Sequence, residues 1–155
     1  MASWAEFAAA EPELAARVQE RFQIRKHKTL ATLRRDGSPR ISGIEIQFEG
    51  GQMVLGMMPD SRKLSDLRRD ARLAIHSPTD DPPAERPAAW RGEAKISGQA
   101  TFVDSPSSSG GGTGSAPSVH IDIAEVVFTQ LNEQGDRLVV ESWHPGVGRR
   151  RIERE

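Results

Sequence analysis

The sequence predicts a mainly β protein, in which six or seven antiparallel strands close into a small barrel flanked by helices. Three observations predict this fold class. Hydrophobic residues alternate with a period of two over much of the chain from Lys28 onward, which is the period of half-buried strands. The tight-turn dipeptides Asp36-Gly37 and Gly50-Gly51 join the first alternating segments, as is typical of antiparallel hairpins. A sheet of this size leaves two unpaired edges unless it closes, so we expect a barrel and not an open sheet.

Two short helices are predicted at the N-terminus, over residues 3–10 and 12–23. Ser3 followed by Glu6 is a capping-box pattern, and Pro12 suits the first position of the second helix. Hydrophobic residues then recur every four positions, at Leu14, Val18 and Phe22. We expect the two helices to cover one end of the strands that follow.

A meander of strands interrupted by one short helix is predicted next. The strands cover Thr29–Arg34, Pro39–Glu49, Gln52–Met57 and Arg72–Ser77. Residues 61–70 form the short helix before the last of these strands, because Leu64, Leu67 and Ala71 recur at helical spacing. Since tight turns join the first three strands, this part is antiparallel and not a βαβ unit.

The second half of the chain adds long, bent strands. Arg91–Val103 is one of them, and Gly98 within it suggests a sharp bend or a close approach of another backbone. The segments Val119–Asn132 and Arg137–Trp143 form the last hairpin. Alternation along the first of these two segments indicates that its buried face switches near Ala124.

Three further segments carry no strand or helix pattern. Pro78–Ala89 contains four prolines and is predicted to be a loop. Asp104–Pro117 is rich in Gly and Ser, so we expect a flexible connection within the domain. His144–Glu155 is a tail with three consecutive arginines.

Length and composition limit the function classes. The chain has 155 residues, which suits one domain over residues 1–155, and its net charge of −1 does not indicate a polyanion-binding protein. The absence of Cys excludes disulfides, thiolate nucleophiles and zinc–thiolate sites, and the absence of Tyr removes much of the aromatic platform of nucleic-acid-binding barrels. No apolar run approaches the roughly 20 residues of a membrane helix, and the N-terminus lacks the basic segment of a secretory signal. We therefore expect a cytoplasmic protein that binds neither membrane nor nucleic acid.

The stretch Met57–Ser77 carries the clearest functional pattern. Asp60 or Ser61 can cap the helix that follows by accepting a hydrogen bond from a free backbone N–H. Arg62 and Lys63 fall in the first helical turn, where the helix dipole is already positive. Uncapped N–H groups together with Arg and Lys form an anion site, and phosphate is its usual ligand. The alternative is a solvated, arginine-rich helix without a ligand.

With these elements in order, the chain resembles the pyridoxamine 5′-phosphate oxidase-like family of flavin- and deazaflavin-dependent oxidoreductases, which have a split β-barrel. The most specific part is Ser61-Arg62-Lys63, because an Arg-Lys pair at this helix start holds the phosphate of FMN in that family. The segment Arg40-Ile41-Ser42-Gly43 is similar to the strand that lines the isoalloxazine ring. Gly56-Met57 ends the next strand, where flavin-binding members commonly have a hydroxyl residue, so Met57 departs from the pattern.

The resemblance implies an FMN-binding oxidoreductase that acts on an unidentified small organic substrate. It also implies a homodimer with the cofactor in a cleft between the chains. Trp143, which is followed by Arg149 and Arg150, resembles a C-terminal Trp and Arg that the family places near the flavin; the alternative is a core tryptophan. The implied cofactor-binding residues are Arg40, Ile41, Ser42, Gly43, Gly56, Met57, Ser61, Arg62, Lys63 and Trp143. No catalytic residue is identified.

Other functions on the same fold remain open. The chain can be a deazaflavin-dependent reductase, or a protein that binds flavin or haem without turnover. His76, near the end of a strand, is the candidate haem ligand. His120 and Asp122 share one strand face, but two residues are too few for a metal site, so no metal is expected.

Overall fold

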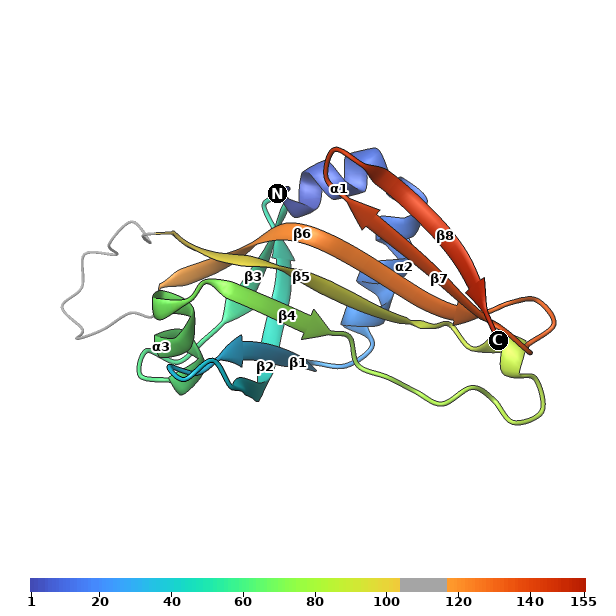
Figure 1. The fold of residues 1–155 in the computed structure, drawn as a ribbon, viewed down its shortest axis with the longest axis horizontal. Coiled ribbons are helices and arrows are strands. Elements are labelled where there is room, and N and C mark those ends of the chain that lie inside the picture. Colours follow the sequence, from blue (N-terminus) through green and yellow to red (C-terminus); the bar gives the residue numbers. More distant parts are fainter. Residues whose placement is uncertain (104–116) are drawn as a thin grey trace.

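The computed structural model of the protein describes residues 1–103 and 117–155, so the predicted flexible connection lies, apart from Pro117, outside the described residues. The described residues form one sheet of eight strands, and all its neighbouring strands are antiparallel (Figure 1). The strands are β1 (His27–Leu33), β2 (Pro39–Glu49), β3 (Gln52–Gly56), β4 (Arg72–His76), β5 (Glu93–Val103), β6 (Ser118–Leu131), β7 (Leu138–His144) and β8 (Gly148–Arg154). Their order in the sheet is β3-β2-β1-β4-β5-β6-β7-β8.

The strands from β3 to β6 in this order close into a barrel. β3 also pairs with β6, where Val54 faces His120 and Leu55 faces Val119. This closure pairs backbone groups that would otherwise form open edges. The predicted antiparallel barrel with flanking helices is confirmed. The sheet has eight strands, however, because β7 and β8 continue it beyond the barrel (right in Figure 1).

β5 and β6 belong to both the barrel and its extension because they bend at a β-bulge. The register shifts between Ser97 and Gly98, and Ala124 is the extra residue on the opposite strand. A Cβ on Gly98 would lie 1.9 Å from the Asp122 carbonyl oxygen, so this close approach requires glycine. The buried positions of β6 change from odd to even numbers across the bulge. Both the predicted close approach at Gly98 and the predicted face switch near Ala124 are confirmed.

The segment after β7 is a strand, so its interpretation as a tail is wrong. The chain turns back through Gly146 and Gly148, whose φ angles are 76° and 92°, a conformation that favours glycine. β8 then pairs with β7 along its whole length. The strand escaped prediction because consecutive arginines obscure its alternation. One of them, Arg149, is held by an ion pair with Glu141 of β7.

The N-terminal helices α1 (Trp4–Ala10) and α2 (Pro12–Gln23) have nearly the predicted bounds and pack against β3, β5 and β6. The Ser3 hydroxyl accepts a hydrogen bond from the Glu6 N–H, and the Glu6 carboxylate accepts one from the Ser3 N–H, so the predicted capping box is present. Phe7 is fully buried, and its ring centroid lies 4.9 Å from that of Trp143. Burying one such side chain stabilises the fold by roughly 1.5–3 kcal/mol.

Helix α3 (Arg62–Arg69) lies away from the other two helices, at the left in Figure 1. It packs against β1, and its Leu64 and Leu67 are buried. A short 3-10 helix, η1 (Pro87–Ala89), lies within the predicted proline-rich loop between β4 and β5. Across residues 1–103 and 117–155, none of the helices is long and apolar enough to cross a membrane.

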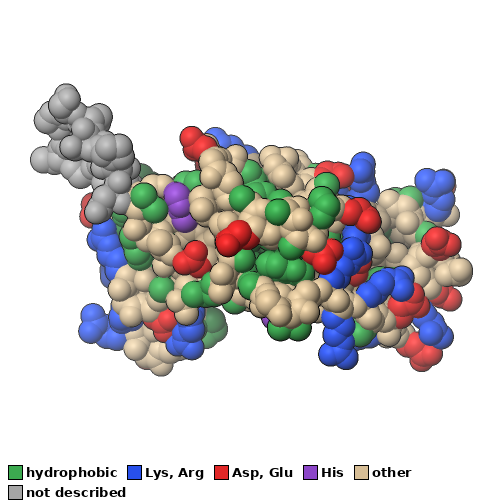
Figure 2. All heavy atoms as spheres, turned by 90° about the horizontal axis from the view of Figure 1, so that it is seen from above, with side chains coloured by type: hydrophobic (Ala, Val, Ile, Leu, Met, Phe, Trp, Pro, Cys, Tyr) green, Lys and Arg blue, Asp and Glu red, His purple; other side chains and the backbone are tan. Residues whose placement is uncertain are grey.

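The face of the molecule seen in Figure 2 carries both charged and hydrophobic side chains. Acidic and basic side chains lie interspersed toward the end that carries the β7–β8 hairpin, at the right in Figures 1 and 2. Hydrophobic side chains are visible in the middle of the same face. Charges of opposite sign therefore neighbour one another at that end, which agrees with a net charge near zero.

Candidate functional site

The N-terminus of α3 is a helix start without a side-chain cap. Ser61 is the N-cap residue, with extended backbone (φ −69°, ψ 144°), but its side chain makes no capping hydrogen bond. The predicted capping bond from Ser61 is therefore absent. Its Oγ is buried and has no hydrogen-bond partner among the described residues. A buried polar atom without a partner costs about 1–3 kcal/mol, and the first N–H groups of α3 also lack intrahelical partners, so this helix start leaves donors unused.

Lys63 reaches from the first turn of α3 to the middle of β2. Its Nζ donates a hydrogen bond to the Gly43 carbonyl oxygen at 3.1 Å. The side chain borders a hollow of about 460 Å³, which we call the lysine pocket. This pocket is lined by His27, Gly43, Ile44, Glu45, Gly56, Met57, Met58 and Lys63. The structure thus brings together Gly43 of β2, Gly56 and Met57 at the end of β3, and Lys63 of α3.

Charge is unevenly distributed around the lysine pocket. Glu45 lines it together with His27, and the Glu45 carboxylate lies 3.3 Å from Lys26 Nζ and 3.7 Å from His27 Nε2. An anionic group placed beside Glu45 would meet a like charge. Because like charges repel, Glu45 disfavours a phosphate beside it, whereas Lys63 favours one.

Arg62, the neighbour of Lys63 in the sequence, borders a different hollow. We call this hollow of about 610 Å³ the arginine pocket. It lies between α3 and the turn that joins β1 to β2, and it is lined by Arg34, Arg35, Asp36, Arg40, Arg62, Ser65, Asp66 and Arg69. Successive residues of a helix point about 100° apart, so the predicted Arg62–Lys63 pair is divided between two pockets. Arg40, also a predicted site residue, lies with Arg62.

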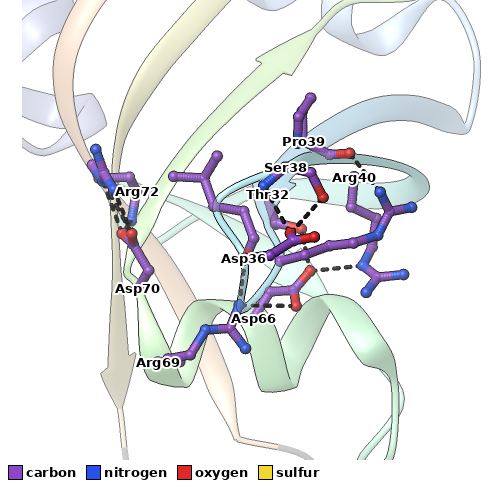
Figure 3. Close-up of polar contacts among 11 residues, drawn as sticks. Thr32, Asp36, Ser38, Pro39, Arg40, Asp66, Arg69, Asp70 and Arg72 are labelled. Carbon is purple, nitrogen blue, oxygen red and sulfur yellow. Dashed lines mark hydrogen bonds and ion pairs between the residues drawn. The ribbon is translucent and has the colours of Figure 1, made fainter.

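Asp66 anchors the wall of the arginine pocket (Figure 3). Its buried carboxylate accepts hydrogen bonds from Thr32 Oγ1 at 2.8 Å, Arg40 Nε at 2.7 Å and Arg69 Nη2 at 3.2 Å. Burial alone would raise the pKa of Asp66, but the hydrogen bonds from Arg40, Thr32 and Arg69 outweigh it and hold the pKa below its ordinary value. Asp66 is therefore ionised at neutral pH and fixes two guanidinium groups at the pocket wall.

Sequence reasoning missed most of the arginine pocket. Arg34 and Arg35 stand next to a turn signal, where charged residues are ordinarily solvated, and Asp66 and Arg69 have helical spacing that fits an exposed face. The only signal was the density of arginine in the two segments. Their meeting depends on how the β1–β2 turn sits against α3, which no local pattern specifies.

The remaining predicted residues do not line either pocket. Ile41 lies on the outer face of the barrel and is 76% exposed, while Ser42 is half-buried. Trp143 is a core residue of this chain: it is buried and packs against Phe7 of α1. Because β7 belongs to the extension beyond the barrel, the structure does not bring Trp143 to the other predicted residues.

The histidines do not assemble a metal centre. No group of three or more His, Asp or Glu that could hold a metal ion occurs among residues 1–103 and 117–155. The Nδ1 of His76 lies 2.7 Å from the Ser77 carbonyl oxygen, and its Nε2 lies 3.7 Å from a Glu93 carboxylate oxygen. Both ring nitrogens of His76 therefore face protein oxygen atoms, and a haem iron at Nε2 would have to displace Glu93.

Comparison with known proteins identifies the fold. No protein-family model matches the chain, and no curated protein matches it significantly. A pyridoxamine 5′-phosphate oxidase-related, FMN binding protein from Nostoc punctiforme PCC 73102 aligns over 100% of this chain and 98% of its own, with a TM-score of 0.63 and 11% sequence identity. PhzG from Burkholderia lata 383, in complex with tetrahydrophenazine-1-carboxylic acid, aligns over 97% of this chain and 92% of its own, with a TM-score of 0.62 and 13% identity.

A heme binding protein from Mycobacterium smegmatis aligns over 90% of this chain and 58% of its own, with a TM-score of 0.52 and 20% identity. All three likenesses have low identity and therefore concern the fold alone. The chain shares the split-barrel fold of pyridoxamine 5′-phosphate oxidase-related proteins, as the sequence predicted.

Proposed function

We propose that the protein binds FMN at the lysine pocket and the N-terminus of α3, and that it is an oxidoreductase acting on a small organic substrate. The observation that carries this proposal is the position of Lys63, which holds a cation beside the Gly43 carbonyl of β2 and the end of β3. The fold shared with an FMN binding protein supports the choice of cofactor.

The residues at the start of α3 fit a phosphate group. Ser61 Oγ is buried without a partner among the described residues, and the first-turn N–H groups point toward the positive end of the helix dipole. Lys63 adds a full positive charge at the same end. Met57 supplies no hydroxyl, and Ser61 Oγ would have to rotate out of its buried position to bond the phosphate. Arg62 would reach the same phosphate only by turning away from the arginine pocket.

The isoalloxazine ring would lie along residues 40–43 of β2, with Gly56 and Met57 at its phosphate end. A Cβ on Gly43 would have no atom within 4 Å, so the surface of β2 is open at this point. The bound flavin supplies the electron transfer itself. The residues of this chain bind the phosphate, orient the ring and shield it from water on one side.

Titration of FMN tests the phosphate site, with riboflavin as the ligand that lacks a phosphate. A charge-assisted hydrogen bond is worth about 1.5–3 kcal/mol, so Lys63→Ala is expected to weaken FMN binding roughly 10- to 100-fold. Riboflavin should bind wild type and Lys63→Ala alike. Arg68→Ala is the matched control, because it removes an exposed cation from the same helix at a position that lines neither pocket.

Either of two results would contradict the proposal. One is equal affinity of wild type for FMN and riboflavin, and the other is an unchanged FMN affinity in Lys63→Ala. The spectrum of the bound cofactor also separates the alternatives, since a flavin, a deazaflavin and a haem absorb differently. Oxidation of NAD(P)H, or turnover of a reduced deazaflavin, by the loaded protein would establish an enzyme and exclude a binding protein without turnover.

The outer face of the barrel supports the proposed homodimer. Two hollows of about 200 and 160 Å³ lie there, share Ala31 and Ala74, and are lined mainly by apolar atoms. Ile41, within the segment assigned to the flavin ring, borders one of them and is 76% exposed. A second copy would cover this face next to the cofactor segment. Light scattering at micromolar concentration with FMN present should give the mass of a dimer, and a monomer would rule the proposal out.

A further inference from the structure

The sulfur atoms of this chain belong to methionine alone. The sequence contains four methionines and no cysteine. Met53 is fully buried in the core and Met57 is 9% exposed, whereas Met1 and Met58 are 63% and 76% exposed. A thioether is oxidised readily only where an oxidant can reach it. Met1 and Met58 are therefore the two methionines that are open to oxidation in solution.

Met58 borders the lysine pocket, although most of its surface is exposed. Its backbone carbonyl oxygen accepts a hydrogen bond from the Ser61 N–H at 3.1 Å, which ties it to the start of α3. Lys63, from the first turn of that helix, borders the same hollow. Met1 borders a different hollow, beside the β5–β6 bulge. The two exposed methionines thus share their chemistry and differ in their place.

Oxidation of Met58 would change the character of this border. A thioether is apolar and only a weak hydrogen-bond acceptor, whereas methionine sulfoxide is polar. The sulfoxide oxygen would bring partial negative charge to the pocket in which Gly56, Met57 and Lys63 are assigned to the phosphate end of FMN. It would disfavour a phosphate there by repulsion, and it would compete with the phosphate for the Lys63 ammonium group.

We propose that Met58 is a reversible oxidation site through which hydrogen peroxide controls FMN binding. The thioether sulfur takes one oxygen atom from the peroxide and loses two electrons, and the rest of the peroxide leaves as water. Methionine sulfoxide reductases reverse the change: two thiols are oxidised to a disulfide, and the oxygen atom leaves as water. This inference rests on the proposed function, because it assumes that the lysine pocket binds FMN.

Peptide mapping by mass spectrometry, after treatment with increasing amounts of hydrogen peroxide, tests the site itself. We expect Met58 to be oxidised at least about tenfold faster than Met57 and Met53, and within about threefold of the rate of Met1. Saturating FMN should slow the oxidation of Met58 and leave that of Met1 unchanged, since Met1 borders another hollow.

Titration of FMN before and after peroxide treatment measures the consequence. Oxidation should weaken FMN binding to wild type by about fivefold or more, and methionine sulfoxide reductases should restore it. Met58→Leu is the matched control, because it keeps an apolar side chain without sulfur and retains the exposed Met1. Peroxide should change the FMN affinity of that variant by less than about twofold. Met58→Gln, with a polar side chain of similar length, should bind FMN like oxidised wild type without any peroxide.

Three results would overturn the inference. Oxidation of Met58 no faster than that of Met57 would mean that its sulfur is not accessible. Equal losses of FMN affinity in peroxide-treated wild type and Met58→Leu would assign the effect to another residue. An unchanged FMN affinity in oxidised wild type would separate residue 58 from cofactor binding. Failure of the proposed function is seen separately, in untreated protein, when FMN and riboflavin bind equally or Lys63→Ala leaves FMN binding unchanged.

Discussion

Two buried carboxylates, Asp66 and Glu141, each sit between two arginines at different ends of the molecule. Asp66 of α3 binds Arg40 and Arg69, whose side chains are 24% and 32% exposed. Glu141 of β7 accepts a hydrogen bond from Arg17 Nη1 at 2.7 Å and also bonds Arg149, and these arginines are 25% and 29% exposed. Burial and partner type are therefore nearly the same at the two sites.

The surroundings of the two carboxylates differ in charge balance. Around Glu141, Arg17 also lies 3.7 Å from Glu13, and Arg149 lies 3.5 Å from Glu11. Arg17 additionally stacks over the Phe128 ring at 4.8 Å. Each arginine of this cluster thus has more than one partner within the protein. The arginine pocket instead gathers three further arginines next to the Asp66 pairs.

The comparison shows what separates a structural ion cluster from a candidate binding site. Both contain a carboxylate whose pKa is lowered: burial alone would raise the pKa of Glu141, but hydrogen bonds from Arg17 and Arg149 outweigh it. A lowered carboxyl pKa therefore does not mark function here. The Asp66 site differs in its excess of cations and its open hollow, which leave donors that a ligand can use.

Glu141→Gln should have the largest effect, because it removes the charge that two partly buried arginines share. Breaking a buried ion pair from one side costs about 3–5 kcal/mol, and the partial exposure of these arginines places the expected loss near 3 kcal/mol. Urea unfolding at neutral pH measures it. The control is Glu153→Gln on β8, whose pair with Arg151 is at the surface and should be worth about 1 kcal/mol or less. A Glu141→Gln protein as stable as wild type would contradict the conclusion that Glu141 and its two arginines form a stabilising ion cluster.

Lowering the pH should reduce the stability that Asp66 and Glu141 each contribute to the fold. Each loss should be smaller than the loss expected for Glu141→Gln. The folded-state pKa of Asp66 and of Glu141 is below the ordinary values of about 3.9 and 4.3. Each group therefore contributes stability that is complete above the ordinary pKa and is lost as the pH falls through the folded-state pKa. We therefore compare the free energies of unfolding of wild type and Asp66→Asn between pH 7 and 3. Their difference should decrease as the pH falls, by up to about 1.4 kcal/mol per pH unit for the one proton involved. The same narrowing is expected for Glu141→Gln.

The outcome at Asp66 sharpens the comparison. A difference in the free energy of unfolding between wild type and Asp66→Asn that stays constant with pH would show that folding does not lower the pKa of Asp66. The charge of Asp66 would then not hold Arg40 and Arg69 at the wall of the arginine pocket. If the difference in the free energy of unfolding from wild type decreases with falling pH in both variants, both carboxylates are stabilised in the same way. The two sites then differ in their charge balance.

The sequence by itself determined the local elements of this protein. Helical spacing and the Ser3–Glu6 capping box specify the N-terminal helices, and turn dipeptides separate the first strands, because both depend on residues within a few positions of one another. Gly98 signalled a close backbone approach, since a side chain there would collide with the opposite strand. The position of Arg62 and Lys63 at a helix start was also visible, because capping and dipole effects are local.

Only the tertiary structure decided how these elements meet. It closed the barrel through the short pairing of β3 with β6, paired β8 with β7, and turned Trp143 into the core against Phe7. It also divided Arg62 from Lys63 and brought the β1–β2 turn to α3, which created the arginine pocket. Apart from the local β7–β8 hairpin, these contacts join residues far apart in the chain, so no periodicity or spacing encodes them. They follow from packing the barrel and closing its edges, which fixes the relative positions of segments whose own sequences leave them open.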